Sequence, residues 1–232
     1  MKKQKGKLIV IDGTDGSGKS TQLALLMEHL KKDGRKFKTI KFPDYANNFF
    51  GSFIGQCLSD ETYNFLHIHP KIVSALYAAD RFESKKKIEE WLADGYVVLA
   101  DRYVSANQIH QGGKIHNAKE RKEFLAWLDK MEYEIFNIPR PDVVLYLSLP
   151  MALIQKLIKA RDDGGEKRAY LHQKKDVHES DSKHLEDARK SALKLIKELN
   201  NFVQIDCAPK KELLSREAIH DMVYAEVKKI IT

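Results

Sequence analysis

The chain has 232 residues, of which 43% are hydrophobic and 31% charged, a balance typical of a soluble globular protein. This length suits one large domain, and because no apolar run is long enough to cross a bilayer we expect neither a membrane protein nor a secretory signal. Two cysteines, Cys57 and Cys207, are too few for a disulfide framework and predict free thiols in a reducing cytoplasm. A net charge of +7 favours anionic partners without choosing between nucleotides and nucleic acid.

A short apolar run at residues 8–11 leads directly into a glycine-rich segment and then into a helical pattern. In that segment Gly13, Gly18, Lys19 and Ser20 match the phosphate-binding pattern G-x-x-x-x-G-K-[ST] at every required position. Glycines let backbone N–H groups surround a phosphate, and the helix that follows directs its positive end at the anion. We expect Lys19 to bridge the outer phosphates and the Ser20 hydroxyl to ligate Mg²⁺. The residues expected to hold the donor nucleotide are Gly13, Thr14, Asp15, Gly16, Ser17, Gly18, Lys19, Ser20 and Thr21.

Strand and helix patterns alternate along the rest of the chain. Further strands are predicted at residues 37–42, 96–100, 142–147 and 202–206. Helices are predicted at residues 23–32, 50–58, 71–92, 120–136, 151–159, 185–199 and 213–231. This order predicts an α/β fold of the P-loop NTPase type: one domain with an open, five-stranded parallel sheet flanked by helices. The ligand site should lie at the carboxyl ends of the strands.

The segment at residues 161–187 differs from its surroundings, because it is charged, poor in aliphatic residues and interrupted by Gly164 and Gly165. A disordered linker would have such a composition. The position of this segment before a predicted helix also suits a mobile lid, which we place at about residues 161–181.

Two pairs of residues should meet the phosphate loop at the carboxyl edge of the sheet. Asp101 and Arg102 directly follow a buried strand, where an acid can hold Mg²⁺ and an arginine can bind a second phosphate. Without the phosphate loop, the same pair would be interpreted as an ion pair at a strand end. Tyr77 and Arg81 lie four residues apart on one helix face, so a ring able to stack on a base stands beside a guanidinium group. A packed tyrosine and a surface arginine would give the same spacing.

The polar segment at residues 105–113 contributes Asn107 and Gln111, whose amides offer donors and acceptors to a base edge. Polar turn residues would look similar, so this segment has little weight by itself.

Together these residues resemble the thymidylate kinase family over nearly the whole chain. The resemblance rests on residues 12–22, on Lys41-Phe42-Pro43, on residues 76–81, on residues 101–104 with Asn107 and Gln111, and on residues 175–181. It implies transfer of the γ-phosphoryl group of ATP to dTMP, giving dTDP and ADP for dTTP synthesis, with Mg²⁺ held by Ser20 and Asp101. It also implies a cytoplasmic homodimer that associates through helices such as the one predicted at residues 71–92.

The resemblance assigns roles at matching positions. Asp15 would contact the deoxyribose 3′-hydroxyl, Phe42 and Tyr77 would hold the thymine ring, Arg81 would reach its carbonyl, Arg102 would bind the dTMP phosphate, Asn107 would read the pyrimidine edge, and Tyr45 and Gln111 would be further substrate contacts. Some members of the family have a further basic residue inside the phosphate loop, where this chain has Gly16. The lid residues Arg161 and Arg168 are therefore expected to join Lys19 and Arg102 in catalysis.

Two positions depart from the family pattern. Asp44 and Tyr45 follow Phe42-Pro43 where many relatives have an arginine, so the Tyr45 hydroxyl could replace one phosphate contact. His110 stands where an aromatic ring near the sugar is common.

Two alternative functions remain from the sequence. Another nucleotide or deoxynucleoside kinase is one, although a nucleoside kinase needs a general base and makes less use of Arg102 and Arg81. A non-catalytic P-loop module that binds nucleotide or nucleic acid is the other. Against it, Lys19, Ser20 and Asp101 are the parts that catalysis requires, and no aromatic residues interleave with basic ones as on a nucleic-acid surface.

Overall fold

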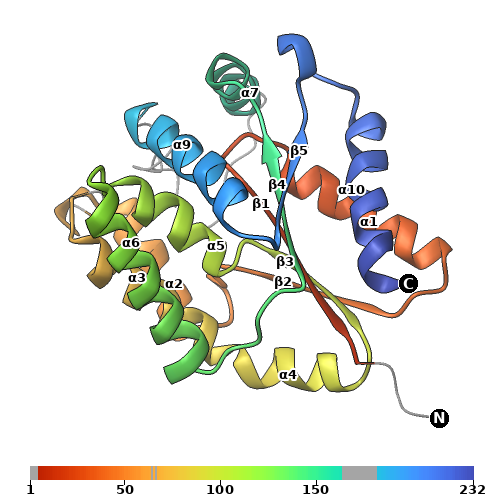
Figure 1. Ribbon diagram of the computed structural model, residues 1–232, viewed down its shortest axis with the longest axis horizontal. Coiled ribbons are helices and arrows are strands. Elements are labelled where there is room, and N and C mark those ends of the chain that lie inside the picture. The colour runs from red at the N-terminus through yellow and green to blue at the C-terminus, as the bar shows by residue number, and fades with distance from the viewer. Residues whose placement is uncertain (1–4, 64, 66, 164–181) are drawn as a thin grey trace.

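Five parallel strands form one sheet, in the order β2-β3-β1-β4-β5 (Figure 1). The structure is a computed structural model that describes residues 5–63, 65, 67–163 and 182–232. The strands are β1 (Lys7–Gly13), β2 (Phe37–Lys41), β3 (Val97–Asp101), β4 (Val143–Ser148) and β5 (Phe202–Asp206). The predicted five-stranded parallel sheet is therefore confirmed, and every strand lies within two residues of its expected bounds.

Helices connect the strands and cover both faces of the sheet (Figure 1). The α-helices are α1 (Lys19–Lys32), α2 (Phe49–Ser59), α3 (Pro70–Glu83), α4 (Lys85–Ala93), α5 (Val104–Ala106), α6 (Ala118–Asp129), α7 (Met151–Asp163), α9 (Ser182–Glu198) and α10 (Arg216–Ile231). Shorter helical segments are η1 (Glu61–Tyr63), η2 (Asn107–Gln111), η3 (Lys130–Ile135) and η5 (Pro209–Lys211), and η2 and η3 have the wider π-helical turn.

Two predicted helices are interrupted. The helix expected at residues 71–92 is broken at Ser84, whose N–H closes α3 on the Arg81 carbonyl and whose hydroxyl accepts from Asn48. That second bond comes from the loop before α2, so the periodicity of α3 and α4 could not reveal it. The helix expected at residues 120–136 is α-helical only to Asp129 and continues as the π-helical turn η3.

Alternating residues of each strand supply two separate cores. In β1, Leu8 and Val10 pack with α3, α4, α6 and α9 on one face of the sheet. Ile9 and Ile11 point to the other face, where α1, α7 and α10 pack. A smaller apolar cluster lies between α2 and α3.

The two faces explain where a ligand site can form. Strands β1 and β3 are neighbours, with Ile11 opposite Asp101 at their carboxyl ends. The chain leaves β1 for α1 on one face and leaves β3 for α5 and η2 on the other. Neighbouring strands whose connections part in this way leave a crevice at the carboxyl edge of the sheet. Within the described residues, no helix has the length and hydropathy of a membrane span.

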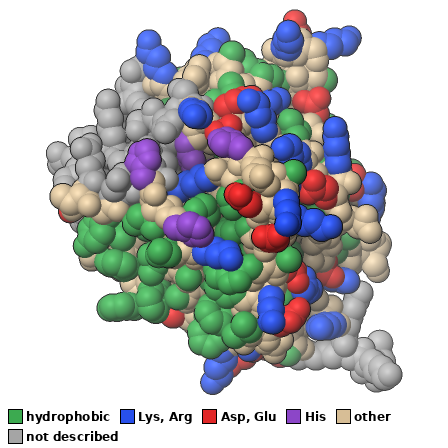
Figure 2. Space-filling view, turned by 60° about the vertical axis from the view of Figure 1, so that its left-hand side comes forward, with side chains coloured by type: hydrophobic (Ala, Val, Ile, Leu, Met, Phe, Trp, Pro, Cys, Tyr) green, Lys and Arg blue, Asp and Glu red, His purple; other side chains and the backbone are tan. Residues whose placement is uncertain are grey.

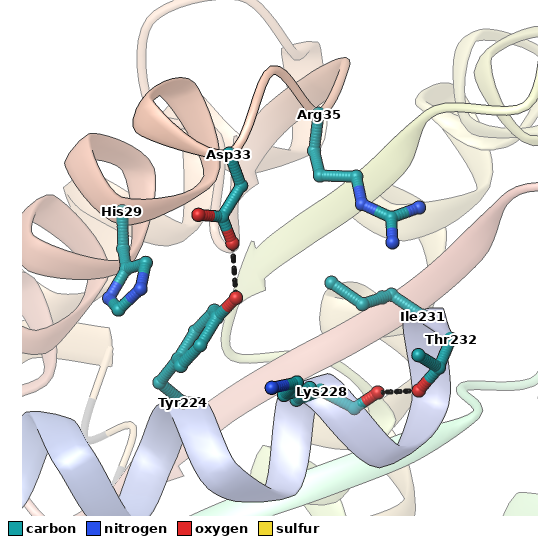
Figure 3. A pocket seen from close by; sticks show the side chains of 7 residues that line it. All are labelled: His29, Asp33, Arg35, Tyr224, Lys228, Ile231 and Thr232. Carbon is teal, nitrogen blue, oxygen red and sulfur yellow. Dashed lines mark hydrogen bonds between the residues drawn. The ribbon is translucent and has the colours of Figure 1, made fainter.

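At the opposite edge of the sheet, the C-terminal half of α1 packs against α10 through two histidines and a tyrosine. Nδ1 of His29 lies 2.9 Å from Nε2 of His220, and the His29 ring stacks on Tyr224 with 3.6 Å between centroids. Figure 3 shows the Tyr224 hydroxyl donating to Asp33 beside an open hollow that Arg35 also lines. Burial, and then the neighbouring His29, lower the pKa of His220 because both disfavour its charged form.

The lowered pKa of His220 should make stability fall in mild acid. A folded pKa below the unfolded value of about 6.5 means that the stabilisation is complete above that pH and is lost as the pH falls below it, by at most about 1.4 kcal/mol per pH unit for one proton. We expect His220→Gln to lose less thermal stability than the wild type between about pH 7 and pH 5.5. Calorimetric melting of both proteins across that range is the measurement, and parallel curves would contradict the expectation.

Candidate active site

The loop between β1 and α1 has the conformation of a phosphate loop. Gly18 takes φ +87°, a left-handed conformation that other residues rarely adopt. At Gly13 a Cβ atom would lie 2.5 Å from Ser17 Oγ and 3.0 Å from the Leu147 carbonyl oxygen, so only glycine fits there. The hydroxyls of Thr14 and Ser17 are buried and have no hydrogen-bond partner among the described residues. The loop therefore holds polar groups ready for a ligand.

Lys19 is folded back over this loop. Its ammonium group donates to the carbonyls of Gly13 and Thr14 at 3.0 and 2.9 Å and lies 3.8 Å from Asp15 Oδ1. Burial, and then the charge of Arg102, lower the pKa of Lys19 to about 8. An arriving phosphate would offer this desolvated ammonium a stronger partner than two neutral carbonyls.

Arg102 joins the loops that follow β1 and β3. Its backbone has φ +66°, a strained value for a residue other than glycine, and its N–H donates to the Ile11 carbonyl at 3.0 Å. The guanidinium donates to Asp15 Oδ1 at 2.8 Å and lies 3.7 Å from Asp12 Oδ1. Burial lowers the pKa of Arg102, but Asp15 and Asp12 more than reverse this effect and raise it. The arginine is therefore charged and aimed at the phosphate loop.

His110 is a further partner of Arg102, which the sequence marked only as a departure from the family pattern. Its Nε2 lies 2.7 Å from Nη1 of Arg102. A guanidinium can only donate, so Nε2 accepts and the proton of the neutral ring is on Nδ1. The ring is buried and stacks on His184 of α9, with 5.5 Å between centroids.

Asp12, at the carboxyl end of β1, is fully buried. It accepts from the backbone N–H of Gly13 at 2.8 Å and from the Ser105 hydroxyl at 2.5 Å. Burial raises the pKa of Asp12, although Arg102 and these hydrogen bonds oppose the rise. Neither Asp12 nor Ser105 was among the predicted site residues, because a strand-end acid and a serine four residues after Asp101 carry no motif of their own.

Asp101 and Ser20 are the residues predicted to hold a metal ion. Oδ1 of Asp101 is buried and has no partner among the described residues, while Oδ2 lies 4.0 Å from the Lys41 ammonium. Ser20 is exposed in the first turn of α1, next to the half-buried Thr21. The described part of the chain contains no group of three or more metal-ligating side chains. A cation here would therefore complete its coordination with phosphate oxygens and water, as Mg²⁺ does.

Arg81 is buried and paired with an acid that sequence reasoning missed. Its guanidinium donates to Glu132 at 2.6 and 2.5 Å and to the Tyr103 carbonyl at 3.3 Å. The carboxamide of Asn107 donates to Glu132 at 3.2 Å and to the Ser74 carbonyl at 3.1 Å. Burial lowers the pKa of Arg81, and Glu132 more than reverses the effect. A lone glutamate in a predicted helix gave no local signal of this pairing.

The other predicted substrate residues surround this group. Phe42 is buried, 5.6 Å from Tyr103 between ring centroids, and the half-buried Tyr77 ring lies 6.0 Å from Phe65. Gln111 is buried, and its Oε1 has no partner within the described ranges. Their substrate contacts remain predictions.

Asp80 holds the loop after β2 in place. Both of its carboxylate oxygens lie 3.3 Å from the backbone N–H of Asp44, and Oδ1 accepts from Asn48 at 2.8 Å. Burial is the largest effect on Asp80 and raises its pKa to about 6. Tyr45, the next residue of this loop, is half-buried.

The predicted lid cannot be placed. Arg161 belongs to α7 by its backbone, but its side chain and all of Arg168 lie outside the described residues. The prediction of a lid at about residues 161–181 therefore stays a prediction.

The fold and this site define a P-loop kinase: a parallel sheet with a phosphate loop and its lysine at the end of β1 and an arginine at the end of the neighbouring β3. The chain belongs to the thymidylate kinase family, because the family model "Thymidylate kinase" matches residues 11–218. It is accordingly a nucleoside monophosphate kinase.

Individual relatives that the chain resembles are thymidylate kinases. A thymidylate kinase of Thermosipho africanus is 32% identical over 96% of both chains, and that of Homo sapiens is 30% identical over 66% of this chain and 65% of its own. A solved structure of thymidylate kinase from Candida albicans has a TM-score of 0.74 and covers 98% of this chain and 94% of its own. At 21% identity, that likeness shows the shared fold.

The lowered pKa of Lys19 should appear in nucleotide binding. ATP favours the charged ammonium, so its Kd should rise, by up to about tenfold per pH unit, once the pH passes about 8. Titration calorimetry from about pH 7.5 to pH 9.5 measures this, with Lys19→Arg as a variant that stays charged throughout. The Kd of the variant for ATP should not change with pH. A wild-type Kd that also stays constant would contradict the lowered pKa of Lys19.

Proposed function

We propose that this chain transfers the γ-phosphoryl group of ATP to dTMP, releasing ADP and dTDP. The observation that carries the proposal is the position of Arg102, which lies 2.8 Å from Asp15 of the phosphate loop and so within reach of whatever the loop binds. An anion on Arg102 would be next to the outer phosphate of a nucleotide on Lys19. Two phosphates held side by side by two cations are what an exchange between nucleotides requires.

In the reaction, an oxygen of the dTMP phosphate attacks the γ-phosphorus, and the bond to the bridging oxygen of ADP breaks. The protein needs to supply little covalent chemistry, so its residues align the two phosphates and neutralise charge. Lys19 would exchange the carbonyls of Gly13 and Thr14 for the outer phosphates, and Arg102 would turn from Asp15 to the acceptor phosphate. Each well-placed donor contributes about 3 kcal/mol to such a transition state.

Asp101 and Ser20 fit a Mg²⁺ ion. Asp101 Oδ1 is buried without a partner in the described part of the chain, and an unpaired carboxylate oxygen suits a hard cation or its water. The Ser20 hydroxyl is exposed at the start of α1. When bound, the ion would neutralise charge on the phosphate oxygens of ATP.

The acceptor base is proposed to lie between α3 and η2, where Arg81 and Asn107 meet. Phe42 and Tyr77 would hold the ring, and Gln111 and Tyr45 would supply further contacts. Asp15, released by Arg102, would contact the 3′-hydroxyl of the deoxyribose. Arg161 and Arg168 of the proposed lid would add positive charge and exclude water, which otherwise hydrolyses ATP.

An assay of ADP release tests the function. The wild type should consume ATP with dTMP and not with thymidine, since Arg102 needs a phosphate to bind. Arg102→Met should lower kcat/KM for dTMP by about 10²- to 10³-fold while leaving the KM for ATP within a few-fold. Arg140→Met removes an exposed arginine paired with Asp129 and should change neither value. Thymidine as the better acceptor would overturn the proposal.

We also propose that the chain forms a homodimer through an apolar face of α2, α3 and η3. Figure 2 shows hydrophobic side chains gathered on this side of the molecule. The exposed fractions reach 76% for Phe49, 58% for Ile72, 49% for Phe82 and 67% for Ile135. Contiguous patches of this kind mark interfaces, and a second copy of the same face is the simplest complement, as the family resemblance implies.

The buried free thiols Cys57 and Cys207 suit the proposed cytoplasmic location.

A charge within the face should separate the copies. Phe82→Asp is expected to shift the protein from the mass of a dimer to that of a monomer in light scattering, because a buried unpaired charge opposes association. Leu213→Asp is the matched control, since this leucine is 44% exposed but precedes α10, outside the face. A Phe82→Asp protein with the wild-type mass would contradict this interface.

A further inference from the structure

Glu132 is a fully buried carboxylate at which three N–H groups converge. Nε and Nη2 of Arg81 donate to it at 2.6 and 2.5 Å, and Nδ2 of Asn107 donates at 3.2 Å. The glutamate lies in the π-helical turn η3, far in sequence from both partners. It therefore ties together the two residues proposed to read the acceptor base, without facing solvent itself.

These contacts fix the orientation of the Asn107 carboxamide. Its nitrogen donates to Glu132 and, at 3.1 Å, to the carbonyl of Ser74. Turning the amide over would place its oxygen against two acceptors, one of them charged, which is electrostatically unfavourable. The oxygen accepts no hydrogen bond from the residues that the structure describes. Asn107 therefore offers a ligand an acceptor and no donor.

Arg81 offers a ligand hydrogen-bond donors. A guanidinium has five N–H donors, and three of those of Arg81 go to Glu132 and the Tyr103 carbonyl. The remaining two can only donate. An acceptor beside donors matches a pyrimidine with a ring N–H next to a carbonyl, as in thymine or uracil. Cytosine presents the reverse at both atoms, a ring nitrogen that accepts and an amino group that donates.

We propose that Glu132 is a positioning residue that sets the hydrogen-bond polarity of the acceptor-base site and thereby excludes cytosine nucleotides, an inference that rests on the proposed function. A carboxylate is required because it accepts at both oxygens. The NH₂ group of a glutamine would face Nε of Arg81 at the place of Oε2, or both Nη2 of Arg81 and the Asn107 amide at the place of Oε1. In the second orientation the Asn107 carboxamide turns over and presents a donor, which cytosine can accept.

The test compares two acceptors on one preparation. The ratio of kcat/KM for dTMP to that for dCMP does not depend on the fraction of folded enzyme, so a loss of stability alone cannot move it. The wild type should favour dTMP by about 10⁴-fold, as sites built to hydrogen-bond their substrate do. Glu132→Gln should lower this ratio by about tenfold or more, with the KM for ATP unchanged.

Glu198→Gln is the matched control, because it removes a carboxylate that lies 3.3 Å from another buried arginine, Arg121, and contacts neither Arg81 nor Asn107 among the described residues. Its ratio should equal that of the wild type. If Glu132→Gln does not fold, the double variant Arg81→Met with Glu132→Leu leaves no unpaired buried charge. Its ratio should fall below that of Arg81→Met alone, which keeps the bond from Asn107 to Glu132, and equal ratios would overturn the inference.

The outcomes separate the inference from the function. A folded Glu132 variant that keeps the full ratio, beside a wild type that prefers dTMP, overturns the inference alone. A wild type that phosphorylates neither dTMP nor dCMP overturns the proposed function and the inference with it.

Discussion

The site depends on one interaction, the guanidinium of Arg102 held between the loops that follow β1 and β3. Those loops diverge because the chain leaves the two neighbouring strands toward opposite faces of the sheet. Arg102 spans the gap at the cost of a left-handed backbone, with Asp15 on one side and His110 on the other. A strained backbone of this kind persists only where surrounding contacts determine it, and here it directs the Arg102 guanidinium toward the phosphate loop.

The charged groups of the site contact one another and the phosphate loop. Among the described residues, Lys19 contacts two loop carbonyls and the more distant Asp15, while Asp12 is buried with Ser105 and Arg102. Burial lowers the pKa of Lys19 and raises that of Asp12, which shows that both groups are poorly solvated. Phosphates and a cation would therefore enter a site already desolvated, in which electrostatic interactions are stronger than in water.

The proposed acceptor-base site is built around two π-helical turns. Asn107 opens η2 and Glu132 lies in η3, and both meet Arg81 of α3 in the buried interior. Such turns are rare and are frequent at functional sites, where the additional residue redirects a side chain. The same region of the fold carries the apolar face of α2, α3 and η3, so the proposed dimer contact and the residues proposed to read the base share their supporting helices.

The sequence by itself determined the sheet, the phosphate loop and the family, because each depends on local pattern: apolar runs, glycine spacing and the residues that end a strand. It also placed Asp101 and Arg102 at the carboxyl edge of the sheet, next to the phosphate loop, since neighbouring parallel strands end at the same edge. It was wrong about the continuity of the helices at residues 71–92 and 120–136, where a contact from Asn48 and a π-helical turn intervene. Only the tertiary structure decided the partners of Arg81 and Arg102, because Glu132 is 51 residues from Arg81 and an ion pair between distant segments leaves no periodic trace in either one.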